Sequence, residues 1–99
     1  MRVEMSLKGE PVYLEVKKTS PGFYDVYFRD TYLGHFYNQG NSWWYACLRM
    51  TVNGEEYFNG RSLPATRKNG GSRANCARYV AIKAYQMGLL QPLLIPMPA

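Results

Sequence analysis

Apolar and polar residues alternate along most of the first 58 residues, and the alternation is interrupted only at short polar turns. A period of two places one set of side chains in a core and the other in water, as in an antiparallel sheet with one buried face. The run from 43 to 52 is the longest, and Asn53-Gly54 follows it directly. This dipeptide favours a two-residue hairpin, because a type I′ turn requires positive φ at both central residues. We therefore expect an antiparallel meander that ends with a short return strand, 55–58.

Two further signals concern the backbone of this sheet. Gly34, inside the predicted strand 32–37, indicates a β-bulge or the close approach of another backbone. Residues 59–71 are rich in Gly, Asn and basic residues, which predicts one long mobile loop. Loops of that length in compact domains are often functional.

A helix is expected over 72–88. Ser72 can act as its N-cap, because its hydroxyl can accept a free backbone N–H of the first turn, and Gly88 is a natural stop. The helix face that should point to water is unusually apolar. We expect either the tail Leu93-Leu94-Ile95 or a second subunit to cover it. The apolar residues of that face are Tyr79, Ile82, Tyr85 and Leu89.

Hydrophobic residues make up 46% of the 99 residues, so the chain can bury one core. We predict one α+β domain over 1–99: a twisted antiparallel sheet of about five or six strands with one C-terminal helix packed on one face. Its expected parts are the sheet 2–58, the basic loop 59–71, the helix 72–88 and the apolar tail 89–99.

The charges are distributed unevenly along the chain. All seven acidic residues lie at or before Glu56, together with six basic residues, so this part has a net charge of −1. The rest carries six cations and no acid. A positive field of this kind attracts anionic partners, nucleic acid first among them. The six cations are Arg61, Arg67, Lys68, Arg73, Arg78 and Lys83.

Three of these cations surround the start of the predicted helix. Arg67, Lys68 and Arg73 lie on either side of Gly70-Gly71, and free N–H groups at a helix start favour phosphate. The segment lacks the spacing of a P-loop. Arg61 and Arg78 extend this predicted phosphate-binding set. The alternative is a solvated loop whose charge serves solubility.

The outer face of the sheet is a second predicted site. Alternation directs Tyr27 and Arg29 outward on one strand, and Trp43, Tyr45 and Arg49 outward on another. Exposed aromatic rings can stack on unpaired bases while arginines hold phosphates. The alternatives are aromatic pairs that only stabilise the sheet, and a protein interface rich in Tyr, Trp and Arg.

Little in the sequence indicates an enzyme. His35 is the only histidine, which excludes a multi-histidine metal site, and no nucleophile-elbow motif is present. A thiolate–imidazole pair of Cys47 with His35 would have no third group to orient it. We expect Cys47 and Cys76 to be buried thiols, because residues 1–8 alternate and do not form a signal peptide. No catalytic residue, metal or cofactor is predicted.

Two families share short features with the chain. The run Gly70-Gly71-Ser72-Arg73, followed by Ala77-Arg78 and Ala81, resembles the end of a double-stranded-RNA-binding domain, where a glycine-rich loop precedes a basic helix start. The segments 24–28 and 33–36 are similar to the sheet of integrase arm-binding and plant AP2-type domains. That resemblance implies a three-stranded sheet that reads the major groove of DNA.

The sequence thus predicts a small cytoplasmic protein that binds DNA or RNA and has no catalytic activity. The alternative is a compact inhibitor or adaptor that binds an acidic protein surface. A homodimer through the outer helix face and the apolar tail would fit either function.

Overall fold

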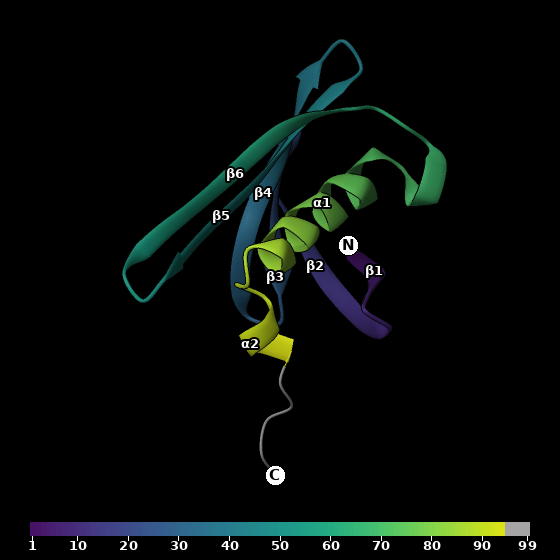
Figure 1. The fold of residues 1–99 in the computed structure, drawn as a ribbon. Coiled ribbons are helices and arrows are strands. Elements are labelled where there is room, and N and C mark those ends of the chain that lie inside the picture. Colours follow the sequence, from purple (N-terminus) through teal and green to yellow (C-terminus); the bar gives the residue numbers. More distant parts are fainter. Residues whose placement is uncertain (95–99) are drawn as a thin grey trace.

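The computed structural model describes residues 1–94 and contains one six-stranded antiparallel sheet, with strands in the order β1-β2-β3-β4-β5-β6. A long helix lies across one face of this sheet (Figure 1). The predicted α+β class and the β-meander followed by a helix are confirmed. The elements are β1 (Arg2–Leu7), β2 (Glu10–Ser20), β3 (Phe23–Phe28), β4 (Thr31–Gly40), β5 (Trp43–Val52), β6 (Glu55–Pro64), the 3-10 turn η1 (Lys68–Gly70), α1 (Ser72–Gln86) and α2 (Gln91–Leu94).

The core lies between α1 and the inner face of the sheet, which is the face that α1 covers. Alternation predicts this inner face correctly on β5, where Ala46, Leu48 and Met50 are buried. Alanines on α1 let the helix approach the strands closely, because they add little volume to its buried face. Those alanines are Ala74, Ala77, Ala81 and Ala84.

The Asn53-Gly54 turn and the special role of Gly34 are also confirmed. Asn53 and Gly54 have φ values of 52° and 81°, as a type I′ hairpin turn requires. The pairing of β3 with β4 shifts register at Gly34. A Cβ atom on Gly34 would lie 2.1 Å from the carbonyl oxygen of Cys47 on β5. Gly34 therefore permits both the bulge and the close approach of β4 to β5.

The predicted loop over 59–71 is wrong in its first half. β6 does not end at Phe58 but continues to Pro64, so that every residue of β5 has a partner on β6. Leu63, opposite Trp44, packs against the core and anchors the extension. The pairing outweighs the poor strand propensity of Asn59 and Gly60, because propensity is weak beside cross-strand contacts.

The start of α1 also differs from expectation. Gly71 occupies the N-cap position, and no side chain caps the helix. The Ser72 hydroxyl instead accepts the Thr66 N–H at 2.7 Å and donates to the Thr66 carbonyl at 3.1 Å. Ser72 therefore holds the incoming chain to the helix start instead of satisfying the free donors of the first turn.

Gly88 does stop the helix. It has φ 74°, its N–H donates to the Tyr85 carbonyl, and the Leu89 N–H donates to the Ala84 carbonyl. These two bonds are those of a Schellman motif. The chain then turns so that Leu90 is fully buried.

The described part of the tail does not extend along the outer face of α1. Leu93 and Leu94 pack against the core cluster from α2, while Ile82 at the centre of that helix face remains 38% exposed. Ile95, which the prediction included, lies outside the described residues. Within residues 1–94, no helix has the length and apolar character needed to cross a membrane.

Candidate nucleic-acid interface

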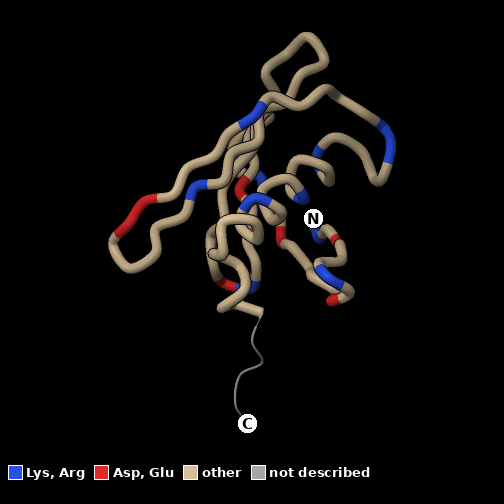
Figure 2. The backbone as a smooth tube through the Cα atoms, in the orientation of Figure 1, with Lys and Arg blue, Asp and Glu red and all other residues tan. Residues whose placement is uncertain are grey.

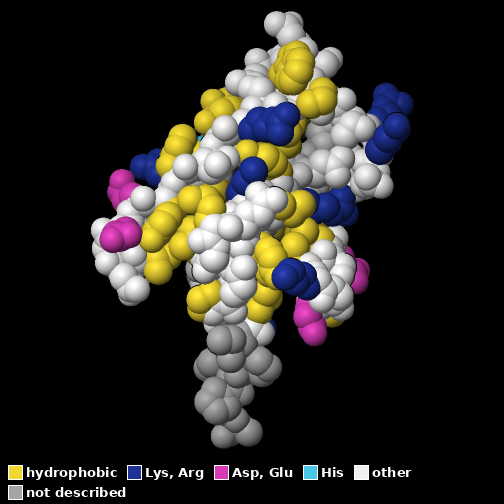
Figure 3. Space-filling model, viewed as in Figure 1, with side chains coloured by type: hydrophobic (Ala, Val, Ile, Leu, Met, Phe, Trp, Pro, Cys, Tyr) yellow, Lys and Arg dark blue, Asp and Glu magenta, His cyan; other side chains and the backbone are white. Residues whose placement is uncertain are grey.

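The six cations that follow Glu56 lie on β6, on α1 and on the segment that joins them. Figure 2 shows these blue segments around the helix, and Figure 3 shows dark blue side chains over the same side of the molecule. Carboxylates in that view lie at the margins. We call this side, which carries Arg61, Arg67, Lys68, Arg73, Arg78 and Lys83, the helix side.

The predicted phosphate-binding loop is short and ordered by hydrogen bonds. Arg67 and Lys68 are exposed at its tip. The Lys68 carbonyl accepts the Gly71 N–H and the Asn75 side-chain amide, both at 3.0 Å. Arg73, in the first turn of α1, is also exposed. The loop and the first turn of α1 together therefore hold three exposed cations at a helix N-terminus that has no side-chain cap and no acid in its first turn.

Arg78 has a different role from the one predicted. Its guanidinium donates to the Glu4 carbonyl on β1, to the Asn69 carbonyl and to the Asn75 Oδ1 atom. It joins η1, α1 and the edge of the sheet. We therefore assign it to positioning the loop, because three of its hydrogen bonds run to other parts of the chain.

Lys83 was not among the predicted site residues, yet it belongs to this surface. Its Nζ atom lies 5.7 Å from the centre of the Tyr79 ring, four residues earlier on α1. Burial raises the pKa of Tyr79, and the charge of nearby Arg61 opposes that rise. Arg61 and Lys83 thus flank Tyr79 on the β6 side of the helix, while Arg78 reaches β1. The i,i+4 spacing of Tyr79 and Lys83 was the signal in the sequence.

None of these cations is neutralised by a carboxylate among the described residues. Across residues 1–94, no Lys or Arg side chain lies within 4.0 Å of a carboxylate, and the single ion pair joins the N-terminal ammonium group to Glu15. The positive field of the helix side is therefore directed to solvent.

The outer face of the sheet contains four of its five predicted residues. Tyr27, Trp43, Tyr45 and Arg49 occupy the outward register positions of β3 and β5. The prediction for Arg29 is wrong: it lies in the β3–β4 turn at φ 54°, and its Nη1 atom donates to the Leu93 carbonyl at 2.8 Å. The turn ends the alternation, so the parity of the strand no longer fixes the direction of that side chain.

The aromatic rings of the outer face pack mainly on one another. Tyr37 stacks on Phe23 with ring centres 5.3 Å apart, and it lies 5.3 Å from Tyr45 on its other side. These contacts are the sheet-stabilising pairs that the alternative interpretation describes. Phe23, which the prediction omitted, and Trp43 remain 48% and 46% exposed at one end of the sheet.

The outer face lacks a net positive charge. Its outward positions carry three cations and four carboxylates, by the registers of the five strand pairs. The helix side is on the opposite face of the sheet from the outer face. One ligand can therefore reach both surfaces only by passing around an end or an edge of the sheet. The outward charged residues are Arg2, Lys17, Arg49, Glu4, Glu15, Asp25 and Glu56.

His35 and Cys47 are cross-strand partners, but they do not form an activated pair. Cys47 is fully buried, its thiol donates to the Leu48 carbonyl at 3.1 Å, and burial raises its pKa. Burial lowers the pKa of His35, and the Tyr32 hydroxyl lies 3.3 Å from His35 Nδ1. Burial thus favours the neutral form of both groups, which is unfavourable for a thiolate nucleophile. Residues 1–94 contain no cluster of three His, Cys, Asp or Glu side chains suited to a metal ion.

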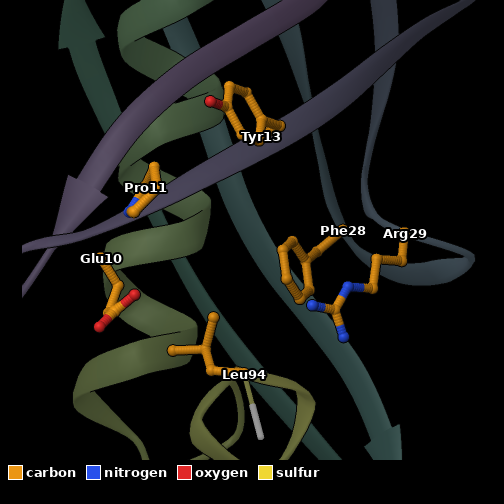
Figure 4. Close-up of a pocket in the computed structure, with 6 residues that line it drawn as sticks. All are labelled: Glu10, Pro11, Tyr13, Phe28, Arg29 and Leu94. Atoms are coloured by element: carbon orange, nitrogen blue, oxygen red, sulfur yellow. The ribbon is translucent and has the colours of Figure 1, made fainter. Parts of the chain in front are cut away.

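A separate hollow of about 400 Å³ lies near α2, away from the basic loop (Figure 4). Arg29 points into it between Phe28 and Leu94, and Glu10 lies on the opposite side. The carboxylate and the engaged guanidinium make this hollow a poor site for phosphate. Its remaining lining residues are Pro11 and Tyr13.

The fold and these surfaces define a small antiparallel α+β domain with one strongly basic side. No protein-family model, curated protein or solved structure matches the chain. The resemblances to double-stranded-RNA-binding domains and to integrase arm-binding and AP2-type domains stay predictions.

Proposed function

We propose that this chain is a nucleic-acid-binding domain without catalytic activity, and that its helix side contacts the phosphate backbone. One observation carries the proposal: the six cations after Glu56 share the helix side, and no carboxylate within residues 1–94 pairs with them. A surface with this field attracts polyanions and releases their counterions on binding.

We assign the phosphate contacts to exposed cations. Arg67, Lys68 and Arg73 surround the uncapped start of α1, and Arg61 and Lys83 extend the surface toward β6. Arg78 supports the loop from behind through its bonds to η1 and β1. The phosphate path therefore runs from the loop along the β6 side of the helix.

We assign the base contacts to the exposed aromatic residues at the end of the sheet near the basic loop. Arg73 lies 5.8 Å from the ring of Tyr24, the residue that follows Phe23. Phe23 and Trp43 keep about half of their surface open to solvent. A strand that leaves the loop around this end can stack unpaired bases on them, at roughly 1–3 kcal/mol for each base. Single-stranded DNA or RNA is thus the preferred class of ligand.

The test compares two triple variants that remove equal charge from opposite sides of the sheet. Arg67→Gln/Lys68→Gln/Arg73→Gln removes three helix-side cations, and Arg2→Gln/Lys17→Gln/Arg49→Gln removes three outer cations. Fluorescence anisotropy with labelled single-stranded DNA, RNA and duplex is followed across a salt series. The helix-side triple should reduce the slope of log K against log salt by about 2 to 3, since each phosphate contact contributes about 0.7–0.9. The outer triple should leave the slope nearly unchanged.

Two results would refute the proposal. Absence of binding to all three ligands at low salt would remove nucleic acid as the partner. Equal reductions of the salt slope in the two triple variants would show that net charge alone drives association. Circular dichroism of both variants confirms that the fold is intact.

A protein partner is the second candidate, because the outer face combines exposed aromatic rings with nearly balanced charge, as protein interfaces do. An adaptor or inhibitor of this kind would bind through Trp43 and its neighbours. Its association would survive nuclease treatment and would fall in Trp43→Ala but not in the helix-side triple. An acidic protein surface would instead bind the helix side, and the helix-side triple would abolish that association after nuclease treatment.

A cytoplasmic location belongs to the same proposal. Cys47 and Cys76 are both free and buried, as we predicted for two small hydrophobic thiols. Unpaired cysteines fit a reducing compartment, where structural disulfides are rare.

A further inference from the structure

The outer edge of β6 is the open edge of the sheet. Among residues 1–94, β6 pairs with β5 on one side and has no strand on the other. The β5–β6 ribbon extends beyond α1, which lies over β4 and β5 (Figure 1). The other edge differs, because Arg78 donates to the Glu4 carbonyl on β1. β6 is therefore the edge at which another strand can add.

The hairpin geometry identifies which backbone groups of β6 are open. Val52 and Glu55 flank the two-residue turn and form a hydrogen-bonded pair, so hydrogen-bonded and non-bonded pairs alternate from there. The even-numbered residues Glu56, Phe58, Gly60 and Ser62 thus direct their N–H and C=O groups away from β5. Among residues 1–94, no other element donates to or accepts from these groups.

Few of the features that normally hinder the addition of another strand are present at this edge. β6 pairs with β5 without a register shift, so it contains no bulge, and its only proline is Pro64 at the end. It contains no lysine. Phe58, in the centre, is 64% exposed, more than any other large hydrophobic residue among those described. An exposed central aromatic residue on an unprotected edge is typical of a strand with a partner.

The sequence of β6 complements itself in antiparallel pairing. If two copies meet with Phe58 opposite Phe58, then Glu55 of each copy faces Arg61 of the other, both on the helix side. Tyr57 then faces Asn59, and Glu56 faces Gly60. The two copies exchange about six backbone hydrogen bonds, because Phe58 and both Glu56–Gly60 positions form hydrogen-bonded pairs.

The charged groups needed for this register are available. Arg61 has no hydrogen bond or ion pair with another residue among 1–94. Glu55 accepts only the Tyr57 hydroxyl at 3.0 Å, through Oε2, which leaves Oε1 open. A shift of the two-fold axis to Asn59 would place Glu55 opposite Leu63, and a shift to Tyr57 would place it opposite Asn59. Only the axis at Phe58 pairs the charges.

We propose that two copies of this chain associate through their β6 edges, with the two-fold axis at Phe58, into one continuous twelve-stranded sheet. The axis runs perpendicular to the sheet, so both α1 helices lie on the same side. The helix sides of the two copies then face the same direction, and their cations other than Arg61, which pairs with Glu55, form one larger basic surface. The dimer does not depend on the proposed function, but it would extend the surface offered to a nucleic acid.

The first test is the mass of the full chain in solution by sedimentation equilibrium. We expect a concentration-dependent species of twice the 11.4 kDa chain mass. Glu55→Arg places like charges opposite each other at two positions and should raise the dimer dissociation constant at least about tenfold. Glu55→Arg/Arg61→Glu reverses both members of the pair and should restore dimerisation. Glu56→Arg, next in sequence but opposite Gly60, is the matched control and should have a smaller effect.

A second measurement reports the register directly. Phe58→Cys should form an intermolecular disulfide on mild oxidation, since hydrogen-bonded partners have Cα atoms about 5.5 Å apart. The native Cys47 and Cys76 do not compete, because both are buried. Thr51→Cys, exposed on β5, is the control that should remain reduced.

Three outcomes would overturn the proposal. One is a single-chain mass at every concentration. The second is a dimer that Glu55→Arg does not weaken while circular dichroism shows a folded chain. The third is a double charge reversal that fails to restore the association weakened by the single change.

Discussion

Replacing Gly34 by alanine tests the closest approach between two central strands of the sheet. The added Cβ would lie 2.1 Å from the Cys47 carbonyl oxygen and 3.0 Å from both the Cys47 carbonyl carbon and Leu48 Cα. All three are backbone atoms of β5, which cannot rotate away as the end of a side chain can. β4 and β5 must therefore separate at this point.

The expected cost follows from these contacts. Overpacking a well-packed site costs about 1–3 kcal/mol, and each backbone hydrogen bond lost in the β4–β5 ladder adds about 1 kcal/mol. We expect the free energy of unfolding to fall by about 3–4 kcal/mol, from a total of about 5–15 kcal/mol for a domain of this size. The melting temperature should fall by about 15 °C or more.

Urea unfolding followed by tryptophan fluorescence measures this change, because Trp43 and Trp44 both lie on β5. Gly9→Ala is the control: its Cβ would meet nothing within 4 Å, and only its φ of 80° opposes the substitution. That variant should lose about 1–2 kcal/mol. If Gly34→Ala costs no more than Gly9→Ala, the close approach of the two strands is not a constraint on stability.

Two further predictions concern the loop and a buried thiol. Arg78→Ala removes three hydrogen bonds and should increase amide hydrogen exchange in η1, at a cost of about 1–2 kcal/mol, whereas Lys83→Ala should leave η1 protected. Burial raises the pKa of Cys76 from 9.0 to about 12. The thiol loses its proton at a lower pH in the unfolded chain than in the folded chain. Its contribution to the free energy of unfolding is therefore fully present below pH 9 and is lost as pH rises toward 12, by up to about 1.4 kcal/mol per pH unit. The slope of unfolding free energy against pH between 9 and 11 should therefore be shallower in Cys76→Ala. Equal slopes in the two chains would contradict this assignment, and for Arg78 the contradicting result is unchanged exchange in η1.

Much of the candidate site was predictable because it depends on local periodicity. Alternation placed Tyr27, Trp43, Tyr45 and Arg49 on one face, and the sheet register agrees. The same rule failed for Arg29, which lies in a turn, and it left Phe23 out of the predicted set. Phe23 is the first residue of its strand and follows a turn, so the alternation before it is too short to predict that its side chain is exposed.

The role of Arg78 could not be predicted from its neighbours in the sequence. Helical periodicity places Arg78 and Lys83, which are five positions apart, on different sides of α1. It could not predict that Arg78 would bind the Glu4 carbonyl, which lies 74 residues away in the chain. A long side chain reaches acceptors on any element that packs nearby, so its role depends on the assembled neighbours.

The sequence by itself determined the class of the fold, the Asn53-Gly54 hairpin, the need for glycine at position 34 and the uneven charge. These properties arise from periodicity, turn geometry and composition, which act over a few residues or over the whole chain. Only the tertiary structure decided that β6 continues to Pro64, because the partners on β5 outweigh weak propensity there. It also decided that the cations share the helix side while the aromatic rings face the other way, because that separation depends on which face of the sheet the helix covers.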